Sequence, residues 1–325
     1  MFRKRILTLL IAWTLLAPGL AVVAGPIDDI VAAVDQASYT SYLTDSLYTH
    51  NGDNRGIGGA QHDLARTNIY NAFVAFGLTT SLEPFTYAGS TYYDVVAVKP
   101  GTNPASGTYI LGAHYDSLNN PGADDNASGV AAVLEAARVL SQYQFNSTLV
   151  FIAFDREEQG LYGSAAYAAA HAGDDIDGMI SLDMLAYNPA GPNHDTVLIY
   201  GRTASNPIKE ALAEAIDLYG GGVTASIQGQ LNSSDHAPFE ARGWQACLLI
   251  ETAVWTNPYY HKSTDSVDTL NYIDYTYATD LTRAATGYIA TAATLTMVPE
   301  PNCTLILLVL TLVKLGRRRP RRGSL

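Results

Sequence analysis

Residues 109–129 read YILGAHYDSLNNPGADDNASG, and this stretch decides the fold because a predicted strand leads through a short loop into a predicted helix. The strand is an apolar, β-like run, and His114 and Asp116 follow it on alternate positions, where it should end. Asp124 and Asp125 lie further on in a loop with proline and glycine, directly before the helical pattern. An imidazole at a strand end, an acid able to orient it and more carboxylates in a tight loop form the beginning of a metal site.

The segments around this stretch alternate between predicted strands and predicted helices. Residues 129–140 place their apolar side chains on one helical face, and residues 149–154 are apolar throughout, as in a strand buried on both faces. Nearer the N-terminus, helical spacing covers residues 28–48 and 61–76. Acids and histidines gather at the strand ends, where open α/β sheets place their sites. The pattern predicts one α/β/α domain, residues 25–297.

Residues 1–24 have the pattern of a secretory signal peptide. Three basic residues precede an apolar run, and small residues follow near a predicted cleavage site at Ala24. A membrane anchor at the N-terminus is the alternative interpretation. With either interpretation, the sequence predicts that the folded domain faces outward from the cell.

Residues 298–325 form a second predicted processing segment. Pro-Glu-Pro at 299–301 precedes an apolar run from Thr304 to Val313 and a cluster of arginines. This order resembles the PEP-type C-terminal sorting signal of bacterial envelope proteins, which implies transient membrane anchoring and cleavage by an exosortase-type enzyme. The alternative is a plain C-terminal anchor, although the run is short for a bilayer span of about 20 residues. The sequence thus predicts an exported protein of the cell envelope or extracellular space, with membrane contact only through its terminal segments.

The charge of the chain argues against one class of partner. The formal net charge is −12, and nine of the bases lie in residues 1–24 and 314–325, so the rest of the chain carries −21. Such an acidic domain is a poor candidate for binding nucleic acid through its phosphates. The two cysteines, Cys247 and Cys303, predict neither a disulfide nor a thiolate metal site.

A set of acids and histidines at predicted strand ends and in loops has the composition of a metal centre. Its members are His114, Asp125, Glu157, Glu158, Asp183 and His261. Carboxylates with two imidazoles and no thiolate suit zinc, or manganese or cobalt. The set holds too many ligands for one tetrahedral catalytic ion, whereas two ions that share a carboxylate would use them.

Five motifs, taken in order, resemble one known family. They are GAHYDS at 112–117, PGADDNASG at 121–129, DREEQGLYGS at 155–164, SLDM at 181–184 and YYHKSTDS at 259–266. The family is that of the secreted co-catalytic dizinc aminopeptidases, the bacterial leucyl aminopeptidase-like branch of metallopeptidase family twenty-eight. The resemblance runs from about Tyr92 to Val267. It implies a central mixed, mostly parallel β-sheet flanked by helices, two zinc ions, and hydrolysis of the N-terminal bond of peptides with a free N-terminus.

The same resemblance implies how the metals are held. His114 and Asp183 would hold one ion, Glu158 and His261 would hold the other, and Asp125 would bridge them. Asp125 is preferred to its neighbour because the bridging acid of the family stands directly before the element that reads Asn-Ala-Ser-Gly here. The resemblance also implies a cis peptide bond after Asp125.

Three further residues receive roles from the resemblance. Asp116 would accept a hydrogen bond from the ring of His114 and fix its tautomer. Glu157 would act as the general base, taking a proton from the attacking water and passing it to the leaving amine. Tyr260 would help to stabilise the tetrahedral oxyanion.

Other functions are compatible with parts of the sequence. A glutaminyl cyclase-type acyltransferase and a carboxypeptidase can share the fold, and a non-catalytic surface display domain is the third alternative. The pair His114 and Asp183 counts against the cyclase, which binds one zinc, and a complete ligand set with a base counts against a display domain. The sequence leaves open the preferred N-terminal side chain, the metal, the oligomeric state, and whether residues 26–60 are a propeptide.

Overall fold

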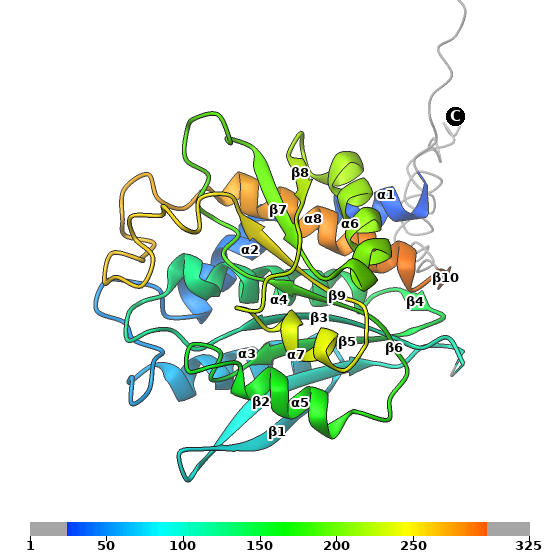
Figure 1. Ribbon diagram of the computed structural model, residues 1–325, viewed down its shortest axis with the longest axis horizontal. Helices are drawn as coiled ribbons and strands as arrows, with labels where there is room; N and C mark the ends of the chain where they lie inside the picture. Colours follow the sequence, from blue (N-terminus) through cyan, green and yellow to red (C-terminus); the bar gives the residue numbers. More distant parts are fainter. Residues whose placement is uncertain (1–24, 104, 298–325) are drawn as a thin grey trace, which may run out of the picture.

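The computed structural model describes residues 25–103 and 105–297 of the chain (Figure 1). The predicted signal segment 1–24 and the predicted sorting segment 298–325 lie outside the described residues. Among the helices of the described part, none combines the length and the apolar character that a bilayer span requires.

An eight-stranded mixed β-sheet forms the centre of the domain, with the strand order β1-β2-β5-β3-β6-β9-β7-β8. The pairs β5/β3, β3/β6, β6/β9 and β7/β8 are parallel, and the other three pairs are antiparallel. The strands are β1 Thr79–Tyr87, β2 Ser90–Lys99, β3 Thr108–His114, β5 Thr148–Phe154, β6 Ile176–Leu182, β7 Thr196–Tyr200, β8 Thr224–Ile227 and β9 Ala246–Glu251. A separate pair joins β4 Gln144–Phe145 to β10 Leu295–Met297. The predicted single α/β domain with a mixed sheet is confirmed.

Helices cover both faces of the sheet (Figure 1). The larger layer contains α1 Pro26–Ala32, α2 Gln36–Ser41, α3 His62–Ala75, α4 Gly129–Leu140, α6 Asn206–Tyr219 and α8 Tyr275–Ala292. The smaller layer contains α5 Tyr162–Ala170 and α7 His236–Ala241. The short turns η1 Tyr42–Ser46, η2 Ala123–Ser128 and η3 Thr203–Ser205 complete the described elements.

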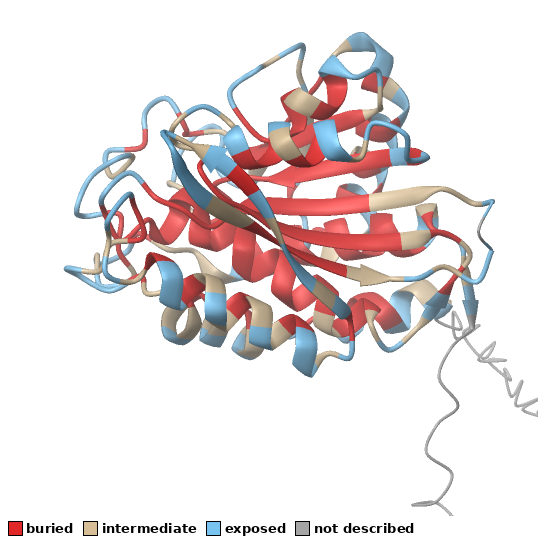
Figure 2. Cartoon of the chain, turned by 90° about the horizontal axis from the view of Figure 1, so that it is seen from below, coloured by how far each residue is buried: buried red, intermediate tan, exposed pale blue. Residues whose placement is uncertain are grey.

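Strand β5 shows why the sequence forms a buried sheet. Leu149, Phe151 and Ala153 pack into the core beneath the larger helical layer, and the alternate residues Val150 and Ile152 pack beneath the smaller one. Side chains alternate between the faces of a strand, so a continuous apolar run is what a strand with helices on both sides requires. Figure 2 shows the buried inner strands and the buried sides of the helices that face them.

The N-terminal part differs from the helix predicted for residues 28–48, because that segment forms α1, α2 and η1 instead of one helix. The chain breaks at Asp35, whose backbone N–H donates to Glu135 Oε1 at 2.7 Å and whose carboxylate accepts from the N–H of Ser38 at 3.1 Å. Ile30 and Tyr39 are fully buried in the core. Residues 26–60 are therefore packed as part of the domain, whatever processing the chain undergoes.

Candidate metal centre

The candidate site lies at one edge of the sheet, where β3, β5 and β6 end. These strands are parallel, so their carboxyl ends meet at the same edge. His114 is the last residue of β3, Asp183 directly follows β6, and Glu157 and Glu158 lie in the turn after β5. Turn η2 and the loop after β9 bring in the remaining two ligand candidates, Asp125 and His261.

Two groups of side chains form around Asp125. In one, ligand atoms of His114, Glu157 and Asp183 lie within 4.8 Å of one another; in the other, those of Asp125, Glu158 and His261 do. His114 Nε2 lies 3.4 Å from Asp125 Oδ1, and His261 Nε2 lies 3.1 Å from Asp125 Oδ2. The two carboxylate oxygens of Asp125 therefore face one histidine each, as a bridging ligand would require.

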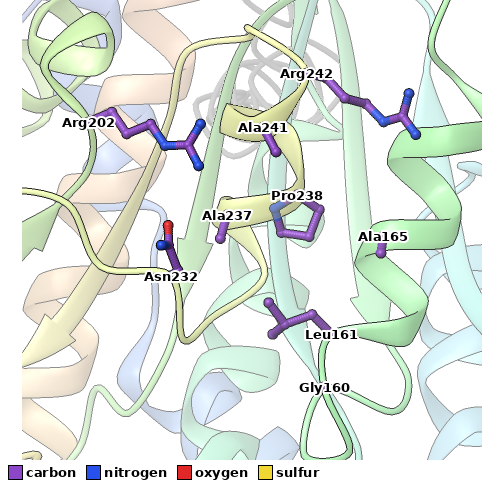
Figure 3. A pocket seen from close by; sticks show the side chains of 9 residues that line it. All are labelled: Gly160, Leu161, Ala165, Arg202, Asn232, Ala237, Pro238, Ala241 and Arg242. Atoms are coloured by element: carbon purple, nitrogen blue, oxygen red, sulfur yellow. The ribbon is translucent and has the colours of Figure 1, made fainter.

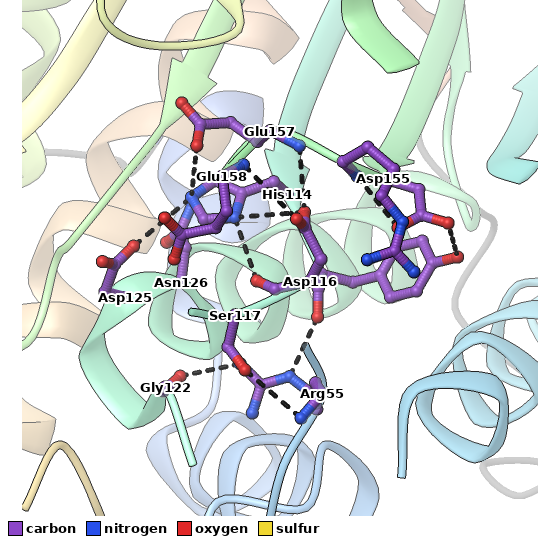
Figure 4. A network of polar contacts seen from close by, with 12 residues as sticks. Arg55, His114, Asp116, Ser117, Gly122, Asp125, Asn126, Asp155, Glu157 and Glu158 are labelled. Carbon is purple, nitrogen blue, oxygen red and sulfur yellow. Dashed lines mark hydrogen bonds and ion pairs between the residues drawn. The ribbon is translucent and has the colours of Figure 1, made fainter. Parts of the chain in front are cut away.

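The remaining contacts separate the two groups. Asp183 Oδ1 lies 3.5 Å from His114 Nε2, whereas Glu158 Oε2 lies 3.3 Å from His261 Nε2. Glu157 Oε2 is further from the ring of His114, at 4.0 Å. Figure 4 shows the side chains of Glu157 and Glu158 diverging from neighbouring positions of one turn.

The residues present fit divalent cations. His114, Asp125 and Asp183 are almost completely buried, at 1%, 4% and 6% exposure. Asp125 Oδ2 and Glu158 Oε1 are buried without a hydrogen-bond partner. In the part of the chain that the structure describes, no lysine or arginine pairs with an acid of the two groups. Buried carboxylates need a compensating positive charge, and carboxylates with imidazoles are suitable zinc ligands.

Burial and mutual repulsion shape the titration of the cluster. Burial raises the pKa of Glu158 to about 7, and the negative charge of Asp125 adds to the effect. Burial likewise raises the pKa of Glu157 well above its usual range. The nearby carboxylates of Asp125 and Glu158 raise the pKa of His261 to about 10. Burial alone would raise the pKa of Asp125, but the rings of His114 and His261 bring it below its usual value. Acids crowded in a buried site attract positive charge.

The carbonyl oxygen and the carboxylate of Asp116 both lie near the ring of His114. His114 Nδ1 lies 3.1 Å from the carbonyl oxygen of Asp116 and 3.6 Å from its carboxylate, so the carbonyl is the nearer acceptor. A carbonyl only accepts, which places the proton on Nδ1 and leaves the lone pair of Nε2 facing Asp125 and Asp183. The carboxylate of Asp116 also accepts the backbone N–H groups of Glu157 at 3.1 Å and Glu158 at 3.3 Å.

Two residues that the sequence analysis did not identify hold turn η2 in place. Arg55 is fully buried and donates to the carbonyl oxygens of Tyr115 at 2.9 Å and Gly122 at 2.7 Å, and to that of Pro121 (Figure 4). The carboxylate of Asp265 accepts the backbone N–H groups of the two acids in η2, at 2.8 and 3.2 Å. These contacts fix the backbone around Asp125, the ligand candidate in η2.

Asp124 points away from the two groups. Its Oδ1 accepts from the backbone N–H of Ala186 at 2.8 Å, and its Oδ2 accepts from Asn257 Nδ2 at 3.3 Å. The choice of Asp125 as the ligand candidate therefore agrees with the geometry. The peptide bond between Asp125 and Asn126 is cis, as the resemblance implied.

A cavity of about 130 Å³ opens onto the two groups. One wall is apolar and includes Met184, Ile250 and Trp255, the last with 64% of its surface exposed. Tyr260 also lines the cavity, with its ring stacked on that of His261 at 3.7 Å between centroids. Burial raises the pKa of Tyr260, so its hydroxyl keeps its proton and can donate a hydrogen bond into the cavity.

The model of peptidase family M28 matches residues 94–286, which is more than half of the chain. The chain belongs to peptidase family M28. This assignment confirms the family, while its secreted dizinc branch stays a prediction, and the match covers the strands and loops that carry both groups of the candidate metal centre.

Two curated proteins are similar to this M28 chain over most of its length. The uncharacterized protein YfbL of Escherichia coli (strain K12) is 30% identical over 270 residues, which cover 71% of this chain and 80% of that protein. Leupeptin-inactivating enzyme 1 of Streptomyces exfoliatus is 31% identical over 284 residues, which cover 79% of this chain and 61% of that enzyme.

Solved structures share the fold. The LapA aminopeptidase of Legionella pneumophila superposes with a TM-score of 0.70 at 24% identity, covering 83% of this chain and 75% of that one. BSAP, a zinc aminopeptidase from Bacillus subtilis, is 27% identical, with a TM-score of 0.56 and coverage of 64% and 52%. The glutaminyl cyclase of Porphyromonas gingivalis gives a TM-score of 0.66 at 20% identity, with coverage of 80% and 99%. The fold alone therefore does not separate peptide hydrolysis from cyclisation.

Proposed function

We propose that this M28 peptidase removes single N-terminal residues from peptides, using two zinc ions and Glu157 as the general base. Its enzyme class, a metalloaminopeptidase, follows from the family and from the aminopeptidases among its relatives. The observation that carries the proposal is the pair of ligand groups that meet at Asp125. A cyclase with a single zinc has no use for a second ligand group.

In this proposal, His114 and Asp183 would hold one ion, Glu158 and His261 would hold the other, and Asp125 would be shared between them. Two zinc ions are the expected cofactors, and manganese or cobalt would suit the same oxygen and nitrogen donors. When bound, such a pair supplies Lewis acidity that polarises the peptide carbonyl and makes a water molecule more acidic.

Glu157 is free to act as the base because the neighbouring Glu158 faces His261. Its carboxylate lies 4.0 Å from His114 Nε2, beside the group in which the water would be activated. Glu157 takes a proton from water as the water oxygen attacks the carbonyl carbon of the first peptide bond. When the carbon–nitrogen bond breaks, Glu157 returns that proton to the leaving amine, which balances the reaction. Asp116, through the two backbone N–H groups, keeps both glutamates in their opposite orientations.

Tyr260, which lines the same cavity, would assist as a hydrogen-bond donor. Its protonated hydroxyl would donate to the carbonyl oxygen as negative charge develops there. The apolar wall with Met184, Ile250 and Trp255 would receive the N-terminal side chain of the substrate.

The proposal includes export of the enzyme. Residues 1–24 would direct secretion, and residues 298–325 would anchor the chain transiently until an exosortase-type enzyme cleaves it. The enzyme would then act in the cell envelope or outside the cell. Cell fractionation, with variants that lack either segment, tests this part.

The central experiment measures hydrolysis of a panel of aminoacyl-p-nitroanilides by the purified chain, with and without a chelator, alongside metal analysis. We expect activity that chelation removes, that zinc restores, and that Glu157→Ala abolishes while two metals per chain remain. One metal per chain at full activity would contradict the two-metal mechanism.

The substrate class is tested separately from the metal site. If the chain binds two metals but hydrolyses none of the aminoacyl-p-nitroanilides, the metal site is supported and the aminopeptidase activity is rejected. N-terminally blocked peptides would then test for a carboxypeptidase, and peptides with N-terminal glutamine would test for a cyclase.

A further inference from the structure

A second hollow, of about 640 Å³, is lined by residues of α5 and α7 and of nearby loops (Figure 3). It is wider than the cavity that contains the ligand groups. Arg202 and Arg242 both line it, together with Asn232 and the turn that leads into α5. None of the lining residues is acidic. In a chain with a net charge of −12, this local charge sets the hollow apart.

The hollow and the metal-centre cavity share two stretches of chain as their walls. The turn after β5 places Glu157 and Glu158 on the cavity and, a few residues later, Gly160 and Leu161 on the hollow. Likewise, Leu231 and Ser233 line the cavity while Asn232, between them, lines the hollow. The two spaces are therefore immediate neighbours.

The chemistry of the proposed reaction sets the direction in which a substrate runs. Glu157 has to reach the leaving nitrogen in order to protonate it, so the peptide beyond the cleaved bond continues on the side of Glu157. The turn that carries Glu157 continues directly to Gly160 and Leu161, which line the hollow. In the proposed function, the N-terminal side chain of the substrate would lie against the apolar residues of the cavity, which include Trp255. The hollow is therefore placed to take the residues that follow the cleaved bond.

Arg202 is held in a fixed position at the hollow. It donates through one terminal nitrogen to the carbonyl oxygen of Glu240 at 3.0 Å, and its Nε lies 3.6 Å from the Glu240 carboxylate. The side chain of Arg202 remains 35% exposed, although its Nε is buried beside the Glu240 carboxylate without a hydrogen bond. Arg242 is exposed at the end of α7. Glu240 thus holds Arg202 through Nε and Nη1, and the other terminal nitrogen, Nη2, lies outside these contacts and can donate to a carboxylate.

We propose that this hollow binds a carboxylate on the substrate downstream of the cleaved bond, and that Arg202 and Arg242 recognise it. The inference rests on the proposed aminopeptidase function and names its substrate class. The carboxylate can be the C-terminal group of a short peptide or the side chain of a downstream Asp or Glu. The enzyme then favours acidic or short peptide substrates in spite of its own negative charge.

The test compares kcat/KM for matched peptides on the full chain. The first pair is Leu-Ala-Ala with a free C-terminus and the same peptide as its amide. The second pair, both amidated, is Leu-Glu-Ala and Leu-Gln-Ala. We expect the charged member of at least one pair to be favoured about tenfold, as one charge-assisted hydrogen bond provides. A preference within the first pair shows that the hollow recognises the C-terminal carboxylate of the peptide. A preference within the second pair shows that it recognises a downstream acidic side chain.

Variants connect the preference to the arginines. We expect Arg202→Gln to reduce the preference about tenfold and the exposed Arg242→Gln to reduce it about threefold. The matched control is Arg283→Gln on α8, in the other helical layer, which pairs with Asp280 and should keep the full preference. A ratio within each pair is the readout because loss of folded enzyme lowers both rates equally.

Two outcomes overturn the inference. Equal kcat/KM within both pairs for the wild type shows that the hollow recognises no carboxylate. If the preference survives in both arginine variants, another part of the molecule recognises the carboxylate. In both cases, hydrolysis of leucyl-p-nitroanilide by the wild type shows that the proposed aminopeptidase function still stands, whereas its absence rejects that function and with it the inference.

Discussion

The carboxylate of Asp116, beyond the end of β3, accepts the backbone N–H of Glu157, in the turn after β5, at 3.1 Å. The second oxygen of the same carboxylate accepts the next N–H, that of Glu158, at 3.3 Å. One carboxylate therefore orients two consecutive peptide groups. Because both N–H groups of the turn are held, the two neighbouring side chains leave it in different directions. Glu158 points toward His261, and Glu157 points toward His114.

Asp116→Asn tests this arrangement. An amide offers one acceptor oxygen where the carboxylate offers two, so one of the two N–H groups loses its partner. We expect activity to fall about 10- to 100-fold, which is typical when a group that orients metal ligands is changed. Activity on leucyl-p-nitroanilide and metal content are the measurements, with Asp217→Asn on the exposed face of α6 as the control. Unchanged activity in Asp116→Asn would show that the turn keeps its shape without this carboxylate.

Arg55→Met tests how far the metal centre depends on the N-terminal segment. The change removes the donors that the Arg55 side chain supplies to five carbonyl oxygens, of which that of Gly122 keeps a second donor, the backbone N–H of Ala127, and the others are those of Leu47, Tyr48, Tyr115 and Pro121. Buried carbonyl groups without donors are costly, so we expect the free energy of unfolding to fall by about 3 kcal/mol or more. Urea unfolding and metal analysis are the measurements.

The control for this prediction is Arg66→Met on α3, which removes an arginine paired with the exposed Asp63. Arg55→Lys should lie between the wild type and Arg55→Met, because it keeps the charge and loses the planar fork of donors. Equal stability of Arg55→Met and Arg66→Met would mean that the hydrogen bonds of Arg55 are replaceable by water.

Tyr260→Phe tests the proposed donor to the oxyanion. Removing one such donor typically costs about 100-fold in kcat, with KM and metal content unchanged. The neighbouring Tyr259 provides a matched control, since its ring packs against Tyr187 and Tyr272 and does not line the metal-centre cavity. We expect Tyr259→Phe to retain activity. A loss of metal in Tyr260→Phe would instead assign this residue to support of His261, on which its ring stacks.

The sequence allowed ligand candidates to be named because they follow strands that are easy to identify. A run such as 149–154, apolar on both faces, is a strong signal for a buried parallel strand, and its end marks the edge where sites form. His114 and Asp183 occupy such ends, so their proximity follows from the topology. The order of the motifs then identified the family.

The parts that the sequence did not predict depend on contacts between distant segments. Helical spacing over residues 28–48 reports which side chains face the core, but the break at Asp35 comes from a hydrogen bond to Glu135, 100 residues away. Arg55 lies in a glycine-rich turn with no local pattern, and its role appears only when the loop before Asp125 folds over it. Similarly, Asp265 belongs to a quoted motif, yet its two bonds to η2 span about half of the domain.

The last prediction concerns the pH dependence of stability through His171. Its ring lies 2.7 Å from Asp174 and 3.1 Å from Glu83 on β1, so it ties the end of α5 to the edge strand. Burial alone would lower the pKa of His171, but the two carboxylates raise it above its usual value. A histidine whose pKa is raised by folding stabilises the protein when protonated. That contribution is complete below about pH 6.5, the unfolded value, and disappears as the pH rises through the folded value.

His171→Gln keeps a polar side chain that cannot be protonated. We expect it to be less stable than the wild type at pH 5.5 and nearly as stable at pH 9, with a difference of at most about 1 kcal/mol because the pair is partly exposed. Comparing the variant with the wild type at each pH cancels the titration of the buried acids, which both proteins share. Urea unfolding at the two pH values is the measurement. A stability difference that is constant with pH, or larger at pH 9, would show that His171 acts through packing against Tyr167 and not through its charge.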